Sequence, residues 1–322
     1  MRISIVVATF NGEKYIQEQL ESFVNQTVLP DEIIISDDGS SDSTMQLLKE
    51  FKDSCSCSIR IVENTGNHGV TGNFENAAKL ATGDIVFFSD QDDVWYQNKI
   101  EKTIKVFDKY PDCVGVVSDA DCVDTNLNKL GVTFNDGAWP QFKQLSYNED
   151  DCFVLRHEVM LETVIKGNIL GGCCLAIRNS YLSKMFPFCP SIYHDDWLCF
   201  CMFVLGDVVA LNKSLFAYRL HGNNTVGFES LNSNKKGFFK KLKKAWRRIR
   251  LSENCFTSNA ERAIYFNQFA AKHGIQDNND LHYQRKINVE RLKAAISSKI
   301  DGVKALKIVE KKYICTVRLI II

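Results

Sequence analysis

Short, uninterrupted apolar segments alternate with helix-like segments through the first 120 residues. The apolar segments are residues 3–8, 32–36, 59–62, 85–89 and 114–118, and stretches with helical spacing lie between them. An apolar run without polar alternation is typical of a strand that is buried on both faces. The pattern therefore predicts an α/β fold, with a mostly parallel sheet flanked by helices.

Polar clusters follow three of these predicted strands. Asn11 and Glu13 follow the first strand, Asp38 follows the second, and Asp90-Gln91-Asp92-Asp93 follows the run Ile85 to Phe88. The carboxyl ends of parallel strands share one edge of the sheet, where ligands bind. Carboxylates there commonly hold Mg²⁺ against the phosphate oxygens of a substrate. The alternative for any one cluster is a solvated acidic turn.

Charge is balanced over the chain but unevenly distributed. The chain has 39 basic and 39 acidic side chains, so nothing attracts it as a whole to nucleic acid. The segment Lys235 to Arg250 carries nine Lys and Arg residues and no acid, and its apolar residues recur at helical spacing. It predicts a basic amphipathic helix, which is either a solvated face or a dock for an anionic membrane surface.

The expected location is cytoplasmic, peripheral on the inner face of the cell membrane. The apolar run after Arg2 is too quickly interrupted for a secretory signal. No stretch reaches the roughly 18 apolar residues of a membrane span. The 12 cysteines include no Cys-x-x-Cys pair, so we expect reduced, structural thiols and no zinc site.

Five ordered segments carry a resemblance to a known family. They are Val7 to Gly12, Asp37 to Asp42, Ser89 to Trp95, His194 to Trp197 and Tyr218 to Asn224. Together they resemble family-two glycosyltransferases of the GT-A fold, and Asp-Gln-Asp-Asp-Val-Trp is most similar to bacterial rhamnosyltransferase-type members. The resemblance implies a GT-A domain over residues 1–227. Residues 228–322 would then add the basic amphipathic helix and a helical C-terminal extension.

The resemblance also implies an activity. It is inverting transfer from a nucleoside diphosphate sugar to an acceptor hydroxyl, with Mg²⁺ or Mn²⁺ on the diphosphate. The acceptor would be a glycan or lipid-linked saccharide in the assembly of bacterial O-antigen, capsule or exopolysaccharide. The implied donor-binding residues are Thr9, Asn11, Glu13, Asp38, Asn73, Asp90 and Asp93. The implied metal ligands are Asp92, Asp90 and His221.

A catalytic base must take the proton of the acceptor hydroxyl. The resemblance implies Asp195 for this role, with Asp196 as the alternative, and His194 stands where the family frequently has Glu. These residues could instead cap the helix that they open. His221 either completes the metal shell, touches the diphosphate or is structural.

Two other function classes are open to such a chain. A sugar-phosphate nucleotidyltransferase shares the sheet and the metal–diphosphate chemistry. It would want a Gly-rich phosphate loop after the first strand, and Thr9 to Glu13 is not one. A catalytically silent, membrane-associated scaffold would need only the basic helix, and carboxylates at every expected position disfavour it.

Overall fold

The computed structural model describes residues 1–137, 142, 145–166, 168–221, 224 and 265–274. Four parallel strands in the order β3-β2-β1-β4 form one half of a mixed sheet. Val6 pairs with Ile34 on one side and with Phe88 on the other, and all three are fully buried. The predicted α/β alternation is thereby confirmed. The strands are β1 (Ile3–Thr9), β2 (Glu32–Asp37), β3 (Ile59–Glu63) and β4 (Ile85–Ser89).

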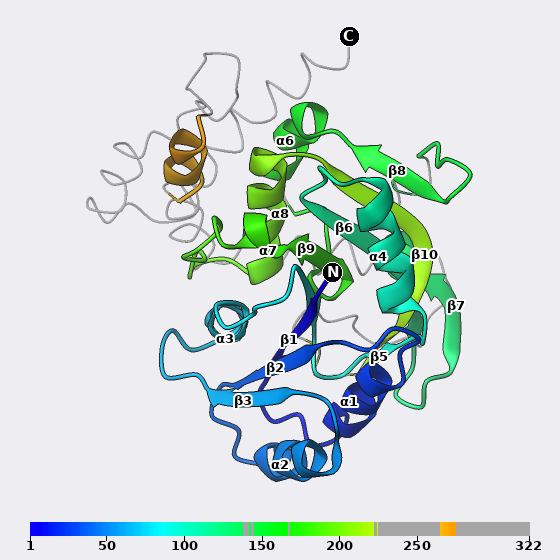
Figure 1. The fold of residues 1–322 in the computed structure, drawn as a ribbon, viewed down its shortest axis with the longest axis vertical. Helices are drawn as coiled ribbons and strands as arrows, with labels where there is room; N and C mark the ends of the chain where they lie inside the picture. The colour runs from blue at the N-terminus through cyan, green and yellow to red at the C-terminus, as the bar shows by residue number, and fades with distance from the viewer. Residues whose placement is uncertain (138–141, 143–144, 167, 222–223, 225–264, 275–322) are drawn as a thin grey trace, which may run out of the picture.

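Helices cover both faces of this half. The chain moves outward from β1 to β3 through α1 (Ile16–Val24) and α2 (Thr44–Ser54), then returns to β4 through α3 (Val70–Ala78). Right-handed crossovers in opposite directions place α3 on the face opposite to α1 and α2. Figure 1 shows β2 and β3 between α2 and α3. The direction of the strand order reverses between β1 and β4, so a ligand crevice is expected at their carboxyl ends.

The second half of the sheet is mixed. After β4 come β9 (Leu175–Arg178), β6 (Gly115–Val123), β10 (Val208–Arg219) and β5 (Val94–Trp95). The strand β6 continues past the predicted end at residue 118, because Asp119 and Asp121 pair with β10. Residues 131–155 hold the end of β7 (Lys129–Thr133), α5 (Phe134–Gly137) and β8 (Cys152–Leu155). The helix α4 (Lys99–Lys109) packs on β6 and β10.

The helix α8 (His194–Leu205) begins at the His194 to Trp197 motif, which the sequence predicts to open a helix. Between β8 and α8 lie α6 (His157–Lys166), the 3-10 turn η2 (Gly172–Cys174), β9 and α7 (Asn179–Leu182). From Trp197 to Val204 every residue of α8 is buried, as expected for a helix that is apolar on all sides. Residues 265–272 are helical and cover α8, with the Phe200 and Phe266 rings stacked at a centroid distance of 3.8 Å.

Several sequence predictions concern the C-terminal part of the chain. The domain boundary near residue 227 and the basic segment Lys235 to Arg250 lie outside the described residues, so both stay predictions. All ten cysteines in the described part are free thiols, as expected. Within the described ranges, no helix is both long enough and apolar enough to cross a membrane.

Candidate active site

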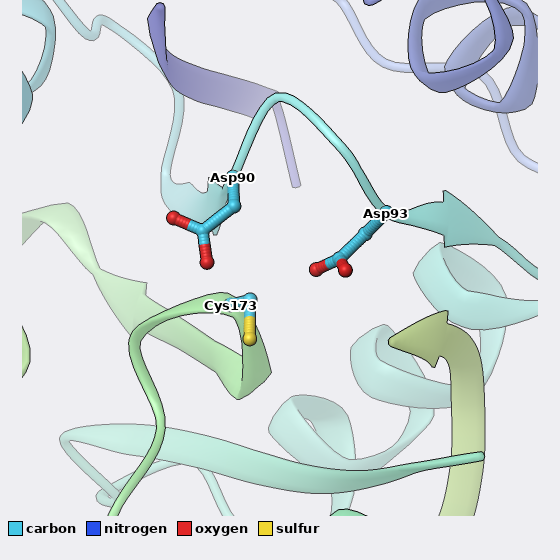
Figure 2. Close-up of side chains that lie close together, drawn as sticks. All are labelled: Asp90, Asp93 and Cys173. Atoms are coloured by element: carbon cyan, nitrogen blue, oxygen red, sulfur yellow. The ribbon is translucent and has the colours of Figure 1, made fainter. Parts of the chain in front are cut away.

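Three carboxylates lie on the loop that connects β4 to β5. Asp93 is fully buried, and its Oδ1 accepts a hydrogen bond from the backbone N–H of Arg219 at 3.2 Å. Its Oδ2 has no hydrogen-bond partner among the described residues. Figure 2 shows that Asp90 and Asp93 flank Cys173, and the ligand atoms of these three residues lie within 4.8 Å of one another. The loop therefore presents two predicted donor-site carboxylates to one space.

Burial makes this cluster hard to ionise. It raises the pKa of Asp90 to about 7, and the charge of Asp92 adds to the rise. Burial also raises the pKa of Asp93 well above its ordinary value.

The buried Lys99 ammonium lies near these carboxylates. It donates a hydrogen bond to the Cys173 carbonyl at 3.0 Å and faces the Trp95 ring at a centroid distance of 4.2 Å. Burial lowers the pKa of Lys99 to about 8, although Asp93 and Asp90 oppose the shift. Sequence reasoning missed Lys99, which is an ordinary lysine near a helix start until its burial is known.

The loop fits a hard divalent cation. Two closely spaced carboxylates, Asp90 and the buried Asp93 with its unpartnered Oδ2 among the described residues, provide the oxygen ligands that Mg²⁺ and Mn²⁺ prefer. The sulfur of Cys173 is a soft ligand and does not suit these ions. The structure also brings together two predicted metal ligands, since His221 Nε2 lies 2.7 Å from Asp92 Oδ2. Asp90 and Asp93 therefore present carboxylate oxygens to one space that would suit the ion, and ligation by Asp92, with His221 beside it, stays a prediction.

Arg219 fixes the position of the acidic loop. Its side chain is only 2% exposed, and its Nε donates to the Asp92 carbonyl at 2.9 Å. Its Nη1 donates to the Thr125 carbonyl at 2.8 Å, and its Nη2 pairs with the Glu18 carboxylate. The guanidinium also faces the Tyr15 ring, on which His221 stacks. Arg219 belongs to the segment Tyr218 to Asn224, but its role cannot be predicted from that segment because its partners are remote in sequence.

The predicted donor residues near the end of β1 lie close together. Thr9 Oγ1 donates to Asp37 Oδ2 at 2.9 Å, and Asn73 Nδ2 donates to the Thr9 carbonyl at 3.0 Å. Asn73 is 2% exposed, and its Oδ1 has no partner in the part of the chain that the structure describes. Asn11 has a positive φ of 48°, and its Oδ1 accepts from the Ser41 N–H at 2.9 Å. These residues border the crevice expected between β1 and β4.

Two other predicted donor residues hold loops in place. Asp38 accepts hydrogen bonds from Asn64 Nδ2, His68 Nδ1 and the Gly69 N–H at 2.8, 2.9 and 2.7 Å, which orders the loop before α3. Glu13 Oε2 accepts from the Ser43 N–H at 2.9 Å, next to the start of α2. Sequence reasoning missed His68, because its partner lies on another strand end. Contact of Asp38 and Glu13 with a nucleotide stays a prediction.

The predicted base lies in the first turn of α8. Asp195 Oδ1 accepts from the Asp196 N–H at 2.8 Å. Burial raises the pKa of Asp195 to about 7, and the charges of Asp196 and Asp90 add to the rise. His194 is buried with its ring 3.9 Å from that of Phe74, and burial lowers its pKa to about 3. His194 is therefore a neutral core residue, and the first residue of the motif that can take a proton near neutral pH is Asp195.

The turn η2 lies between the acidic loop and the base. A methyl group built on Gly172 would lie 2.3 Å from His194 Nε2 and 3.3 Å from Asp195 Cβ. The next residue, Cys173, is grouped with Asp90 and Asp93. One residue of the turn thus packs against the base while the next contacts the acidic loop. The turn therefore brings the first turn of α8 next to the acidic loop.

Known proteins resemble this chain in sequence. The family described as "Glycosyl transferase family 2" matches residues 4–186. An uncharacterized glycosyltransferase of Nostoc sp. is 31% identical over 227 residues, which cover 70% of this chain and 66% of that protein. The dTDP-rhamnosyl transferase RfbG of Shigella flexneri is 38% identical over 125 residues, 38% of this chain and 40% of that protein. The Escherichia coli UDP-Glc:alpha-D-GlcNAc-diphosphoundecaprenol beta-1,3-glucosyltransferase WfgD is 27% identical over 76% of this chain and 83% of its own.

Solved structures share the fold. Staphylococcus aureus TarS in complex with UDP-GlcNAc aligns with a TM-score of 0.55 over 90% of this chain and 77% of its own, at 17% identity. The Pyrobaculum calidifontis mannosyltransferase PcManGT in complex with GDP-Man and Mn²⁺ aligns with a TM-score of 0.51 over 92% and 86%, at 15% identity. The predicted GT-A fold is confirmed by these neighbours. From its matched residues and its fold, the chain belongs to glycosyl transferase family 2.

Proposed function

We propose that this chain is an inverting, metal-dependent glycosyltransferase. It moves a sugar from a nucleoside diphosphate sugar to the hydroxyl of a glycan or lipid-linked saccharide in bacterial surface polysaccharide assembly. The observation that carries the proposal is the turn η2, where Gly172 packs against the first turn of α8, which holds Asp195, and Cys173 lies with Asp90. A base and a diphosphate-binding loop on two sides of one turn are the two groups that the reaction needs.

The residues divide the reaction between them. Asp195 accepts the proton of the acceptor hydroxyl while the hydroxyl oxygen forms a bond to the anomeric carbon of the donor sugar. The bond from that carbon to the diphosphate oxygen breaks, and attack from the opposite face inverts the configuration. A divalent cation bound at Asp90 and Asp92 would supply positive charge to the leaving diphosphate. Burial helps Asp195, because a carboxyl with a pKa near 7 is a stronger base than an ordinary aspartate.

Two further observations support the acceptor class and the membrane surface. The name of WfgD states a diphosphoundecaprenol acceptor, which supports a lipid-linked acceptor for this chain. The nine basic residues of Lys235 to Arg250 support docking to an anionic membrane surface at the cytoplasmic face. The names of the relatives and neighbours include UDP, GDP and dTDP donors, so all three classes of nucleoside diphosphate sugar are candidate donors for this chain.

The test is a donor screen. Purified protein is incubated with UDP-, GDP- and dTDP-sugars and Mg²⁺ or Mn²⁺, and release of nucleoside diphosphate is measured. We expect release with one donor class, and loss of release in Asp195→Asn but not in Asp53→Asn, which alters an exposed carboxylate on α2. Release of pyrophosphate from sugar phosphate and nucleoside triphosphate would identify a nucleotidyltransferase instead. If neither nucleoside diphosphate nor pyrophosphate is released, the remaining class is the catalytically silent scaffold.

A further inference from the structure

The side chain of Gln91 joins two loops at the point where the strand order reverses. Gln91 lies between Asp90 and Asp92, but its carboxamide is bonded to the loop that follows β1. Its Oε1 accepts from the Phe10 N–H at 2.9 Å, and its Nε2 donates to the Phe10 carbonyl at 3.1 Å. The parallel pairing of β1 with β4 ends at Val7 and Ser89. Beyond it, one side chain pairs both backbone polar groups of Phe10, as a neighbouring strand would.

The loop after β1 is shaped to fit this carboxamide. A methyl group built on Gly12 would lie 2.3 Å from Gln91 Oε1 and 2.7 Å from its carboxamide carbon, and its three nearest atoms all belong to Gln91. Only glycine leaves room for the contact. The other side of the loop is held by β2–α2 residues, since the Gly12 N–H donates to Thr44 Oγ1 at 2.7 Å. The loop is thus held between two partners.

We propose that Gln91 is a positioning residue that sets the separation between the two ends of the donor site. It holds the loop Phe10 to Gly12, beside the expected nucleoside pocket, in register with the carboxylates Asp90 and Asp92. This inference rests on the proposed function, because a nucleoside diphosphate must span both loops at once. A loop that is ordered before binding loses less conformational entropy when the donor binds. Gln91 therefore acts on donor affinity and not on the bond changes at the sugar.

The first experiment compares Gln91→Met with the wild type. Methionine keeps the length of the side chain and removes both hydrogen bonds to Phe10. We expect the donor KM, and the Kd of the best-binding nucleoside diphosphate among UDP, GDP and dTDP, to rise about tenfold, which corresponds to about 1.4 kcal/mol. The kcat should stay within about threefold, as for a loss of uniform binding. Gln97→Met, at an exposed glutamine between β5 and α4, is the matched control and should keep the wild-type KM.

A second experiment tests the contact itself. Gly12→Ala should raise the donor KM in the wild type, because its methyl group meets the carboxamide. In a Gln91→Ala background the carboxamide is absent, so adding Gly12→Ala should raise KM no further. Amide hydrogen exchange at the Phe10 N–H should be faster in Gln91→Met, whatever the protein binds. A wild-type KM in Gln91→Met, a loss confined to kcat, or an equal Gly12→Ala penalty in both backgrounds would overturn the inference. Failure of the proposed function would give a different result, because the wild-type protein would then bind none of the nucleoside diphosphates.

Discussion

Replacement of Asp195 by Asn should slow transfer by orders of magnitude and stabilise the protein at the same time. The substitution keeps the shape of the side chain in the first turn of α8 and removes its ability to take a proton. A general base contributes about 10²–10⁴-fold to the rate, so kcat should fall by that factor. Donor affinity should change little, because the base acts on the acceptor hydroxyl in the transition state.

The effect on stability follows from the direction of the pKa shift. The pKa of Asp195 is about 7 in the folded protein against 3.8 for an ordinary aspartate, so the folded state binds the proton more tightly. Ionisation of Asp195 therefore costs stability as the pH rises from about 4 through about 7. Roughly three pKa units at ~1.36 kcal/mol each set a ceiling of about 4 kcal/mol on this cost. Asn carries no charge, so the variant should be the more stable protein at pH 8, and the difference should vanish below about pH 4.

The assay combines kinetics with unfolding. Nucleoside diphosphate release gives kcat/KM, which should rise about tenfold between pH 6 and pH 8 for a single base with a pKa of about 7. Thermal unfolding at pH 5 and pH 8 gives the stability difference. Asp196→Asn is the comparison, and Asp53→Asn is the exposed control. A dead Asp196→Asn beside an active Asp195→Asn would refute the assignment of the base, and a flat profile from pH 6 to pH 8 would refute the pKa argument.

Three more outcomes are expected. Asp92→Asn, like excess EDTA, should abolish transfer, and full turnover in EDTA would contradict the metal assignment. Arg219→Met should lower the free energy of unfolding by at least about 1.5–3 kcal/mol in urea melts, since it removes several hydrogen bonds from a charged donor; wild-type stability would contradict its role in holding the loop. Glutamine at six basic positions of Lys235 to Arg250 should release the protein from anionic liposomes and slow transfer to a lipid-linked acceptor only, whereas unchanged liposome binding would favour a solvated face. The six positions are Lys240, Lys241, Lys243, Lys244, Arg247 and Arg248.

Periodicity and residue type were enough to predict the frame of the site. The apolar runs predicted β1, β2 and β4, because a strand buried on both faces needs apolar residues at every position. Parallel pairing then required Asn11, Asp38 and Asp90 to meet at one edge. A helix start at the His194 to Trp197 motif could also be predicted, since an apolar run follows this polar motif directly. The ends of β6 could not, because its last residues are strand only through their pairing with β10.

The pairings that make the site work were decided by the tertiary structure alone. Gln91 reaches Phe10, His221 reaches Asp92 and Lys99 reaches Cys173, each across more than 70 residues of sequence. The spacing of hydrophobic residues predicts which face of a helix or strand is buried. It does not predict which polar group, distant in sequence, will contact a given side chain in the fold. The raised pKa of Asp195 has the same origin, because burial and neighbouring charges set it and both exist only in the folded chain. Sequence thus determined which chemical groups stand at the strand ends, and packing determined their partners and their acidity.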